Sequence, residues 1–231
     1  MFNYKDFGLE KGNLYEILAT TFSIANKKEI IEPNTACMGI KVNEKNKIQI
    51  TPFHTTTTYR NLKDNGYLVI NFVNDIYLYA LAALKSPEYS DEFLLNHYIY
   101  LSLKKRGRNE FRTFPTIKSS WGFLIGETTK EIENIKKDNY GESPSSTFKI
   151  KIFYSEKNKE SFKLFNRAEN LALEAIVLAT KLKVAKISNN NELYEKLIKQ
   201  IQSYMETIKR IGKNQHALKA IELVGKYIDN L

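Results

Sequence analysis

Four consecutive threonines, Thr55 to Thr58, are the residues of this chain best suited to hold an anion. They follow an alternating segment with apolar Ile48 and Ile50, and they precede a short helical segment that Asn65-Gly66 would end. The first N–H groups of a helix lack intrahelical partners, and the helix dipole is positive at that end. Four hydroxyls at such a point therefore indicate a phosphate-binding site.

The threonine run also has an ordinary structural explanation, because threonine favours strands and helix N-caps. Four in a row beside Arg60 exceed what one cap requires, so phosphate binding is the favoured interpretation. The guanidinium of Arg60 suits bidentate pairing with a phosphate. A solvated position on the helix explains Arg60 equally well.

Asn71 interrupts the apolar strand expected over Tyr67 to Val73. A buried amide needs hydrogen-bond partners. Neighbouring loops are the favoured partners, and the polar edge of a ligand is the alternative.

The remaining reactive residue types give no second constellation. Cys37 is the only cysteine, and its neighbours Ala36 and Met38 indicate a small buried hydrophobe rather than a nucleophile. The histidines, His54, His97 and His216, do not show metal-ligand spacing, so no metal site is expected. His54 is expected to be a structural or surface residue rather than a proton donor, and no catalytic dyad is visible.

The composition is that of a protein with a real core, since 42% of its 231 residues are hydrophobic. No apolar run is long enough to span a membrane, and the N-terminal residues lack the apolar stretch of a secretory signal, so we expect a cytoplasmic protein. The net charge is +9, but the lysines are spread along the chain. This pattern favours a solvated surface that attracts anionic ligands over nucleic-acid binding. The basic segment Lys104 to Arg112 is interpreted as a loop that could close over an acidic substrate.

The first two-thirds of the chain is mainly β structure by its periodicity, with one helix expected over Asp75 to Leu84. Polar and apolar residues alternate over Glu127 to Ile132, which continues the strand expected over Ser119 to Glu127. The segment from Asp138 to Ser146 is expected to be a loop. The expected strands are Tyr15 to Ile24, Ala36 to Lys41, Lys47 to Thr51, Tyr67 to Val73, Ser119 to Glu127 and Thr147 to Tyr154.

The composition changes near Ser155, and from Ser161 onward apolar residues recur at helical spacing. Polar segments at Ser188 to Asn191 and Gly212 to Asn214 divide this region into three helices. We therefore expect a β-barrel-like domain over residues 1–155 and a helical domain over residues 156–231.

Four ordered motifs resemble those of a largely archaeal family of flavoproteins, which is related to flavin reductases and pyridoxamine-phosphate oxidases. The helical motif follows the pattern NRA, EA, ATRL, with Lys181 in place of its arginine. Cys37 replaces the proline of the first motif, AP-x-G. The matching segments are Ala36 to Ile40, Pro52 to Leu62, Tyr67 to Asn71 and Leu164 to Leu182.

The resemblance implies a six-stranded split β-barrel that binds FMN noncovalently in a homodimer, followed by a three-helix unit. It implies phosphate-binding hydroxyls on Thr55, Thr56, Thr57 and Thr58, with Arg60 beside them. It further implies an isoalloxazine and ribityl environment formed by Met38, Thr51, Pro52 and Phe53, with Asn71 on a neighbouring strand.

The function that this resemblance favours is an FMN-dependent oxidoreductase of the flavin reductase type. Its electron donor would be a reduced pyridine nucleotide or another redox donor. Because the chain lacks the glycine fingerprint of a Rossmann fold, a nicotinamide would bind only as a transient substrate. A noncatalytic flavin-binding module is the alternative.

Overall fold

The computed structural model describes residues 2–25, 30–44, 47–85, 96–104, 111–138, 141–159, 167–211 and 214–231. The chain forms two compact units. The barrel unit comprises Met1–Val73, Leu94–Lys137 and Glu142–Ser161. The helical unit comprises Asn74–Phe93, Asp138–Gly141 and Phe162–Leu231. The domain boundary expected near residue 155 stays a prediction.

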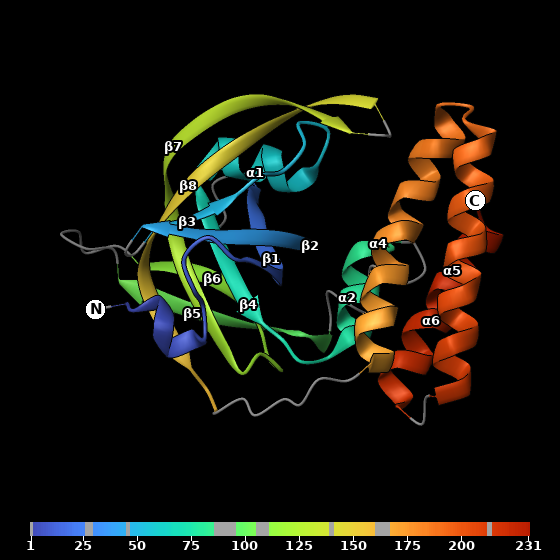
Figure 1. The fold of residues 1–231 in the computed structure, drawn as a ribbon. Helices are drawn as coiled ribbons and strands as arrows, with labels where there is room; N and C mark the ends of the chain where they lie inside the picture. The colour runs from blue at the N-terminus through green and yellow to red at the C-terminus, as the bar shows by residue number, and fades with distance from the viewer. Residues whose placement is uncertain are drawn as a thin grey trace. The chain divides into compact units, whose positions relative to one another are not determined.

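Six strands close into a barrel in the order β1-β2-β3-β8-β7-β4, which confirms the expected six-stranded architecture (Figure 1). The pairs β1–β2, β1–β4, β2–β3, β3–β8 and β4–β7 are antiparallel. A short 3-10 helix, Tyr4–Phe7, precedes the first strand. The strands are β1 (Leu14–Ala25), β2 (Ile30–Glu44), β3 (Lys47–Ile50), β4 (Tyr67–Phe72), β7 (Gly122–Asp138) and β8 (Gly141–Lys157).

Every second side chain of the strands is apolar, and these side chains fill the barrel interior. Ile40 pairs with Ile50, and Val42 pairs with Ile48; all four are at most 1% exposed. Burying one such side chain stabilises a fold by about 1.5–3 kcal/mol. Gly126 of β7 lies at a tightly packed point, because a Cβ on it would stand 2.4 Å from Cγ2 of Ile150.

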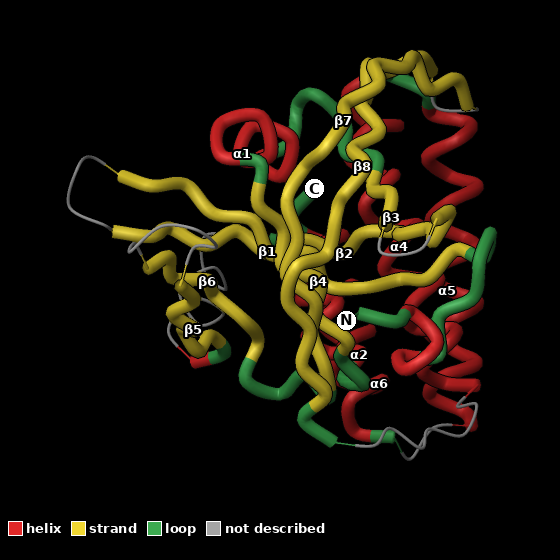
Figure 2. Tube along the Cα trace, turned by 90° about the vertical axis from the view of Figure 1, so that its left-hand side faces the viewer, coloured by secondary structure: helices red, strands yellow, loops and turns green. Residues whose placement is uncertain are grey.

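The segment after β3 forms the short helix that the sequence predicts, α1 (Thr57–Asn65). Thr56 is its N-cap, and Gly66 ends it with a φ of 75°, a left-handed conformation that favours glycine. Leu62 anchors α1 in the barrel core at 2% exposure. In the tube view α1 lies beside the strands of the barrel (Figure 2).

A two-stranded antiparallel sheet of β5 (Tyr98–Lys104) and β6 (Phe111–Ile117) is an addition that the sequence interpretation lacked. Lys104, Phe111 and Arg112 belong to these strands, so the predicted basic loop is wrong at both of its ends. Its central residues, 105–110, lie outside the described residues. Exposure alternates from Tyr100 to Lys104 of β5, which is typical of a sheet with one solvated face.

The strands β7 and β8 are longer than predicted, and Ser119, Ser120 and Trp121 precede β7. The loop predicted over Asp138 to Ser146 is wrong, because β8 begins at Gly141. These outer parts of the strands are rich in charged residues, and most of their described side chains are exposed. Backbone pairing between neighbouring strands stabilises them without an apolar face.

The helical unit contains the three predicted C-terminal helices, α4 (Arg167–Ile187), α5 (Asn191–Ile211) and α6 (Gln215–Asp229). The helix expected after β4 is also present, as α2 (Ile76–Ala83), and it packs on α4 and α6. Leu164 to Asn166 of the helical sequence motif lie outside the described residues. In the described parts of the chain, none of the helices combines the length and the apolar character that crossing a membrane would require.

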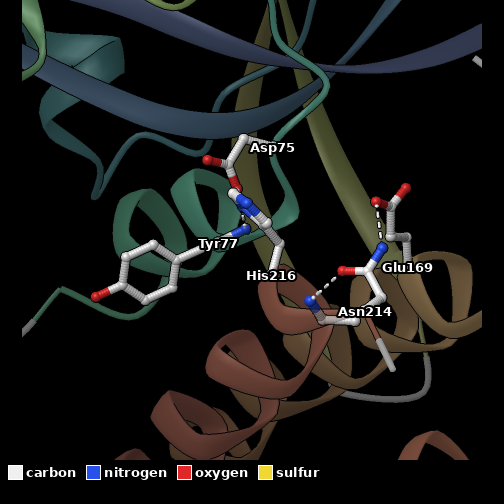
Figure 3. Close-up of polar contacts among 6 residues, drawn as sticks. Asp75, Tyr77, Glu169, Asn214 and His216 are labelled. Atoms are coloured by element: carbon white, nitrogen blue, oxygen red, sulfur yellow. Dashed lines mark hydrogen bonds and ion pairs between the residues drawn. The ribbon is translucent and has the colours of Figure 1, made fainter. Parts of the chain in front are cut away.

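Polar contacts fix the start of α6 within the helical unit (Figure 3). The Asn214 carboxamide accepts from the N–H of Ala217 over 2.9 Å and donates to Glu169 of α4 over 2.9 Å. Nδ1 of His216 lies 2.7 Å from Oδ1 of Asp75, the N-cap of α2. The turn that begins α6 is therefore tied to two neighbouring helices.

Candidate functional site

The chain leaves β3 at Thr51 and runs beside the first part of β8. The N–H of Ser146 donates to the Pro52 carbonyl over 3.1 Å, and the N–H of His54 donates to the Pro144 carbonyl over 3.0 Å. The hydroxyls of Thr51 and Thr147 are 3.0 Å apart. These contacts fix the backbone immediately before the threonine run.

The four threonines have different roles. The hydroxyl of Thr56 accepts from the N–H of Tyr59 over 3.2 Å and donates to the Phe53 carbonyl over 2.7 Å, as an N-cap does. Thr58 is 2% exposed, and its hydroxyl accepts from the Asn34 amide over 3.3 Å. Thr55 and Thr57 are exposed, so their hydroxyls can reach a ligand.

Arg60 connects the two exposed threonines. Nη1 donates to the Thr55 carbonyl over 3.2 Å, and Nη2 donates to the Thr57 hydroxyl over 2.9 Å. The exposed guanidinium thus lies over the N-terminal turn of α1, where the helix dipole is positive. We call Thr55, Thr57 and Arg60 the Thr–Arg corner. It combines hydroxyls with a planar cation, a donor set that suits a phosphate.

Met38 lies on the strand next to the remaining predicted site residues. The β2–β3 register pairs Ile40 with Ile50, so Met38 is two residues before one member of that pair and Pro52 two residues after the other. Met38 is half-buried and packs against the barrel core, and Pro52 is buried. Phe53 is half-buried, with the Lys136 ammonium 5.1 Å from its ring centroid. Met38, in the middle of β2, and the segment of Thr51, Pro52 and Phe53 therefore lie at the C-terminal end of β3.

Asn71 does not join this group. Its strand, β4, is three positions from β3 in either direction around the barrel. The amide is fully buried and donates to the Leu18 carbonyl over 3.1 Å and to the Thr20 hydroxyl over 3.0 Å. Its Oδ1 accepts from the N–H of Ile117 over 2.9 Å. These partners lie on β1 and β6 rather than in loops, and they favour the structural interpretation, in which Asn71 ties the β5–β6 sheet to the barrel wall.

The environment of Cys37 keeps it protonated. Its Sγ is 3.8 Å from Oε2 of Glu16. Burial, followed by the nearby Glu16 carboxylate, raises the pKa of the Cys37 thiol to about 12. A nucleophilic role, which needs the thiolate, is therefore disfavoured.

Sequence analysis missed a cluster of polar groups beneath α1. His54 stacks on Tyr59 with ring centroids 4.3 Å apart, and its Nε2 is 2.8 Å from the Ser146 hydroxyl. Lys63 of α1 donates to Oε2 of Glu131 on β7 over 2.7 Å. No sequence signal joins these residues, because they come from three elements that are distant along the chain.

The Glu131 carboxyl is the electrostatic centre of this cluster. The hydrogen bond from Lys63 is the main cause that lowers its pKa; partial burial opposes this, and the Ser146 hydroxyl and the charge of His54 add to the lowering. Its second oxygen, Oε1, is buried and has no hydrogen-bond partner among the residues that the structure describes.

Two models of one family match the chain. The N-terminal domain model of "Protein of unknown function (DUF447)" matches residues 15–120, and the second DUF447 model matches residues 166–226. Together they account for more than half of the chain. The chain belongs to the DUF447 family.

The chain is also similar to a curated protein and to a solved structure over most of its length. The uncharacterised protein MJ1453 of Methanocaldococcus jannaschii is 25% identical over 188 residues, which are 79% of this chain and 85% of the relative. The FMN-bound DUF447 protein MM1853 from Methanosarcina mazei has a TM-score of 0.71 and 21% identity, covering 97% of this chain and all of that one. The fold is therefore shared over both units, and the resemblance drawn from the sequence motifs is confirmed.

Proposed function

We propose that this chain binds FMN noncovalently, with the phosphate at the Thr–Arg corner. The observation that carries this proposal is the Arg60 guanidinium, which bridges Thr55 and the exposed hydroxyl of Thr57 at the N-terminal turn of α1. A phosphate there would meet a helix dipole, hydroxyl donors and a fixed positive charge at once. The FMN carried by the family member MM1853 supports the choice of ligand.

The residues at the C-terminal end of β3, with Met38 of β2, fit the rest of FMN. Met38, Pro52 and Phe53 offer apolar surface for a ring system, as cofactor sites usually do. The hydroxyls of Thr51 and Thr147 offer donors and acceptors for a polyhydroxyl chain.

We further propose that the protein is an oxidoreductase of the flavin reductase type and that it works as a homodimer. When bound, FMN supplies the hydride-transfer chemistry, while the protein binds and orients it. A reduced pyridine nucleotide is the donor that we propose.

The test is a titration of the purified protein with FMN, riboflavin and FAD, followed by flavin absorbance and fluorescence. We expect FMN to bind far more tightly than riboflavin, since riboflavin lacks the phosphate. Equal affinities for FMN and riboflavin would contradict a phosphate site, and no binding of any flavin would refute the proposal as a whole.

A second measurement separates the enzyme from a noncatalytic module. The FMN-loaded protein is mixed with NADH or NADPH in the absence of oxygen, and bleaching of the flavin absorbance is followed. Bleaching faster than that of free FMN supports the reductase. Tight binding without accelerated bleaching by either nucleotide would favour the flavin-binding module.

A further inference from the structure

The β8 strand lies directly beside the segment that would contact the flavin ring. Phe53 forms an antiparallel bridge with Ser145 of β8, and the hydroxyl oxygens of Thr51 and Thr147 are 3.0 Å apart. Alternate residues of a strand share a face. These four side chains therefore lie on one face of the barrel wall, opposite to Phe148 of β8, which belongs to the barrel core.

The neighbouring strand β7 adds an amide and a cation to this face. Nδ2 of Asn134 donates to the Thr147 hydroxyl over 3.0 Å. The Lys136 ammonium is 5.1 Å from the ring centroid of Phe53. Asn134 and Lys136 are two residues apart in β7, so they too share a face. The β7–β8 hairpin thus carries polar groups to both Thr147 and Phe53.

The Ser145 hydroxyl is the feature of this face that indicates a ligand. Ser145 is 1% exposed, and its hydroxyl has no hydrogen-bond partner within the part of the chain that the structure describes. A buried hydroxyl without a partner is destabilising and uncommon in native proteins. Phe53 is its direct cross-strand neighbour. A ring system that takes the place of the Phe53 side chain would give this hydroxyl a partner.

Lys136 is suited to the same ligand. Its contact with Phe53 is a cation–π interaction, which is weak at an exposed site, and Lys136 is exposed. The lysine side chain has a flexible stem and three N–H donors. The polar edge of an isoalloxazine has carbonyl oxygens that accept hydrogen bonds. The ammonium can therefore exchange Phe53 for the edge of a flavin without a large loss.

A cation at this position also affects the chemistry of a flavin. A hydride brings two electrons and one proton, so its transfer from a reduced pyridine nucleotide adds one negative charge to the ring. A positive charge beside the ring stabilises the more negative form. Arg60 is held by Thr55 and Thr57 at the phosphate end, so Lys136 is the cation at the ring end.

We propose that Lys136 binds the ring of FMN next to Phe53 and raises both the affinity and the reduction potential of the bound flavin. Ser145 supplies a hydrogen bond on the same side. This inference rests on the proposed function, because it takes FMN as the ligand. It makes the β7–β8 hairpin, which carries none of the site residues expected from the sequence, a part of the cofactor site.

The test is a fluorescence titration of FMN and riboflavin against the wild type, Lys136→Met and Lys137→Met. Lys137 is the matched control, because it follows Lys136 on the other face of β7 and pairs with Glu142 over 2.5 Å. Both variants lose one positive charge, so general attraction of the FMN phosphate changes alike in both. We expect Lys136→Met to weaken the binding of both flavins by about tenfold. Lys137→Met should bind riboflavin as the wild type does.

The two flavins distinguish the ring from the phosphate. A loss by Lys136→Met for FMN alone would mean that Lys136 acts on the phosphate, which would overturn this inference. Equal affinities of the two lysine variants for both flavins would also overturn it and leave the proposed function standing. Absence of flavin binding by the wild type would overturn both.

A second measurement is the midpoint reduction potential of bound FMN, determined without oxygen against a reference dye. Lys136→Met should give a more negative potential than the wild type, because the reduced ring loses a stabilising charge. Lys137→Met should leave the potential unchanged. A potential that is equal in the wild type and Lys136→Met would overturn the role of Lys136. Both lysines are exposed, and equal urea midpoints would confirm that the variants fold.

Ser145→Ala tests the position of the ring independently. It should weaken the binding of both flavins by about threefold to tenfold and should not lower the stability of the flavin-free protein, because the hydroxyl has no partner to lose. Ser120→Ala is the control, since the Ser120 hydroxyl is likewise buried without a partner among the described residues. Wild-type affinities of Ser145→Ala for both flavins would overturn the placement of the ring beside Ser145.

Discussion

Arg60 donates to the hydroxyl of Thr57 from one nitrogen and to the carbonyl of Thr55 from another, over 2.9 Å and 3.2 Å. This pairing holds a long side chain over the first turn of its own helix. The guanidinium is thus already placed at the site where we propose that the FMN phosphate binds, which lowers the ordering cost of binding.

The first prediction concerns Arg60. Arg60→Gln should weaken FMN binding by about tenfold to a hundredfold, because it removes a charge-assisted hydrogen bond to the phosphate. Riboflavin affinity should stay unchanged. Fluorescence titration measures both, and Arg210→Gln on the exposed surface of α5 is the control. An equal loss for riboflavin would mean that Arg60 does not act on the phosphate.

Thr56 and Thr57 should respond in opposite ways to loss of their hydroxyls. Thr56→Val removes the N-cap of α1 and should lower the free energy of unfolding by about 0.5–2 kcal/mol. Thr57→Val should leave stability nearly unchanged and weaken FMN binding. Urea denaturation and FMN titration of both variants form the test. Similar changes in both properties for both variants would contradict the division of roles.

Asn71 should affect stability rather than ligand binding. Asn71→Leu leaves the buried Ile117 N–H without its acceptor and removes one of the hydrogen bonds of the Thr20 hydroxyl, so it should cost about 2–4 kcal/mol of unfolding free energy. The folded fraction should bind FMN with wild-type affinity. Affinity that falls while the urea midpoint does not move would restore the alternative in which Asn71 contacts the flavin.

Replacing Gly126 by alanine should destabilise the fold. In Gly126→Ala the new Cβ would meet Cγ2 of Ile150 at 2.4 Å and the Lys151 carbonyl oxygen at 2.9 Å, so we expect a loss of about 1–3 kcal/mol. Gly225→Ala on α6 is the matched control. There the nearest atom, Cε of Met205, is 3.6 Å away, and the substitution should stabilise the helix by about 0.5–1 kcal/mol. Thermal unfolding compares the two.

The Cys37 thiol should be slow to react while the protein is folded. Its raised pKa of about 12 leaves little thiolate at pH 8, so alkylation should be much slower than in urea-unfolded protein. Because the folded-state pKa lies above the ordinary value of 9.0, this thiol favours folding below about pH 9. That contribution is lost as the pH rises from 9 toward 12. Cys37→Ala should flatten stability against pH in this window.

Much of the fold follows from local patterns. The alternation around Ile40 and Ile50 predicts inward-facing pairs, and Gly66 marks the end of α1 because its left-handed backbone favours glycine. The β5–β6 sheet was missed although Tyr98 to Lys104 has strand-forming residues. Its attachment to the barrel depends on Asn71 and on a contact between the Tyr98 and Thr35 hydroxyls. Such contacts between distant residues leave no periodic signal.

The candidate site, like the fold, is only partly predictable from the sequence. A run of hydroxyls before a helix is visible in the sequence, but its separation into capping and exposed threonines requires the backbone turn at Thr56. The contact between His54 and Ser146 joins residues 92 apart in the chain. Only the closed barrel brings them together, so no local pattern predicts it.

The pairing of Thr51 with Thr147 also has a consequence for the order of events on the ribosome. Thr147 is made 96 residues after Thr51. At about 5–20 residues per second, the early segment waits roughly 5–20 seconds for the strand that will hold it. The threonine run therefore emerges long before it can take its final shape, and the contact between Thr51 and Thr147 cannot form until β8 has left the exit tunnel.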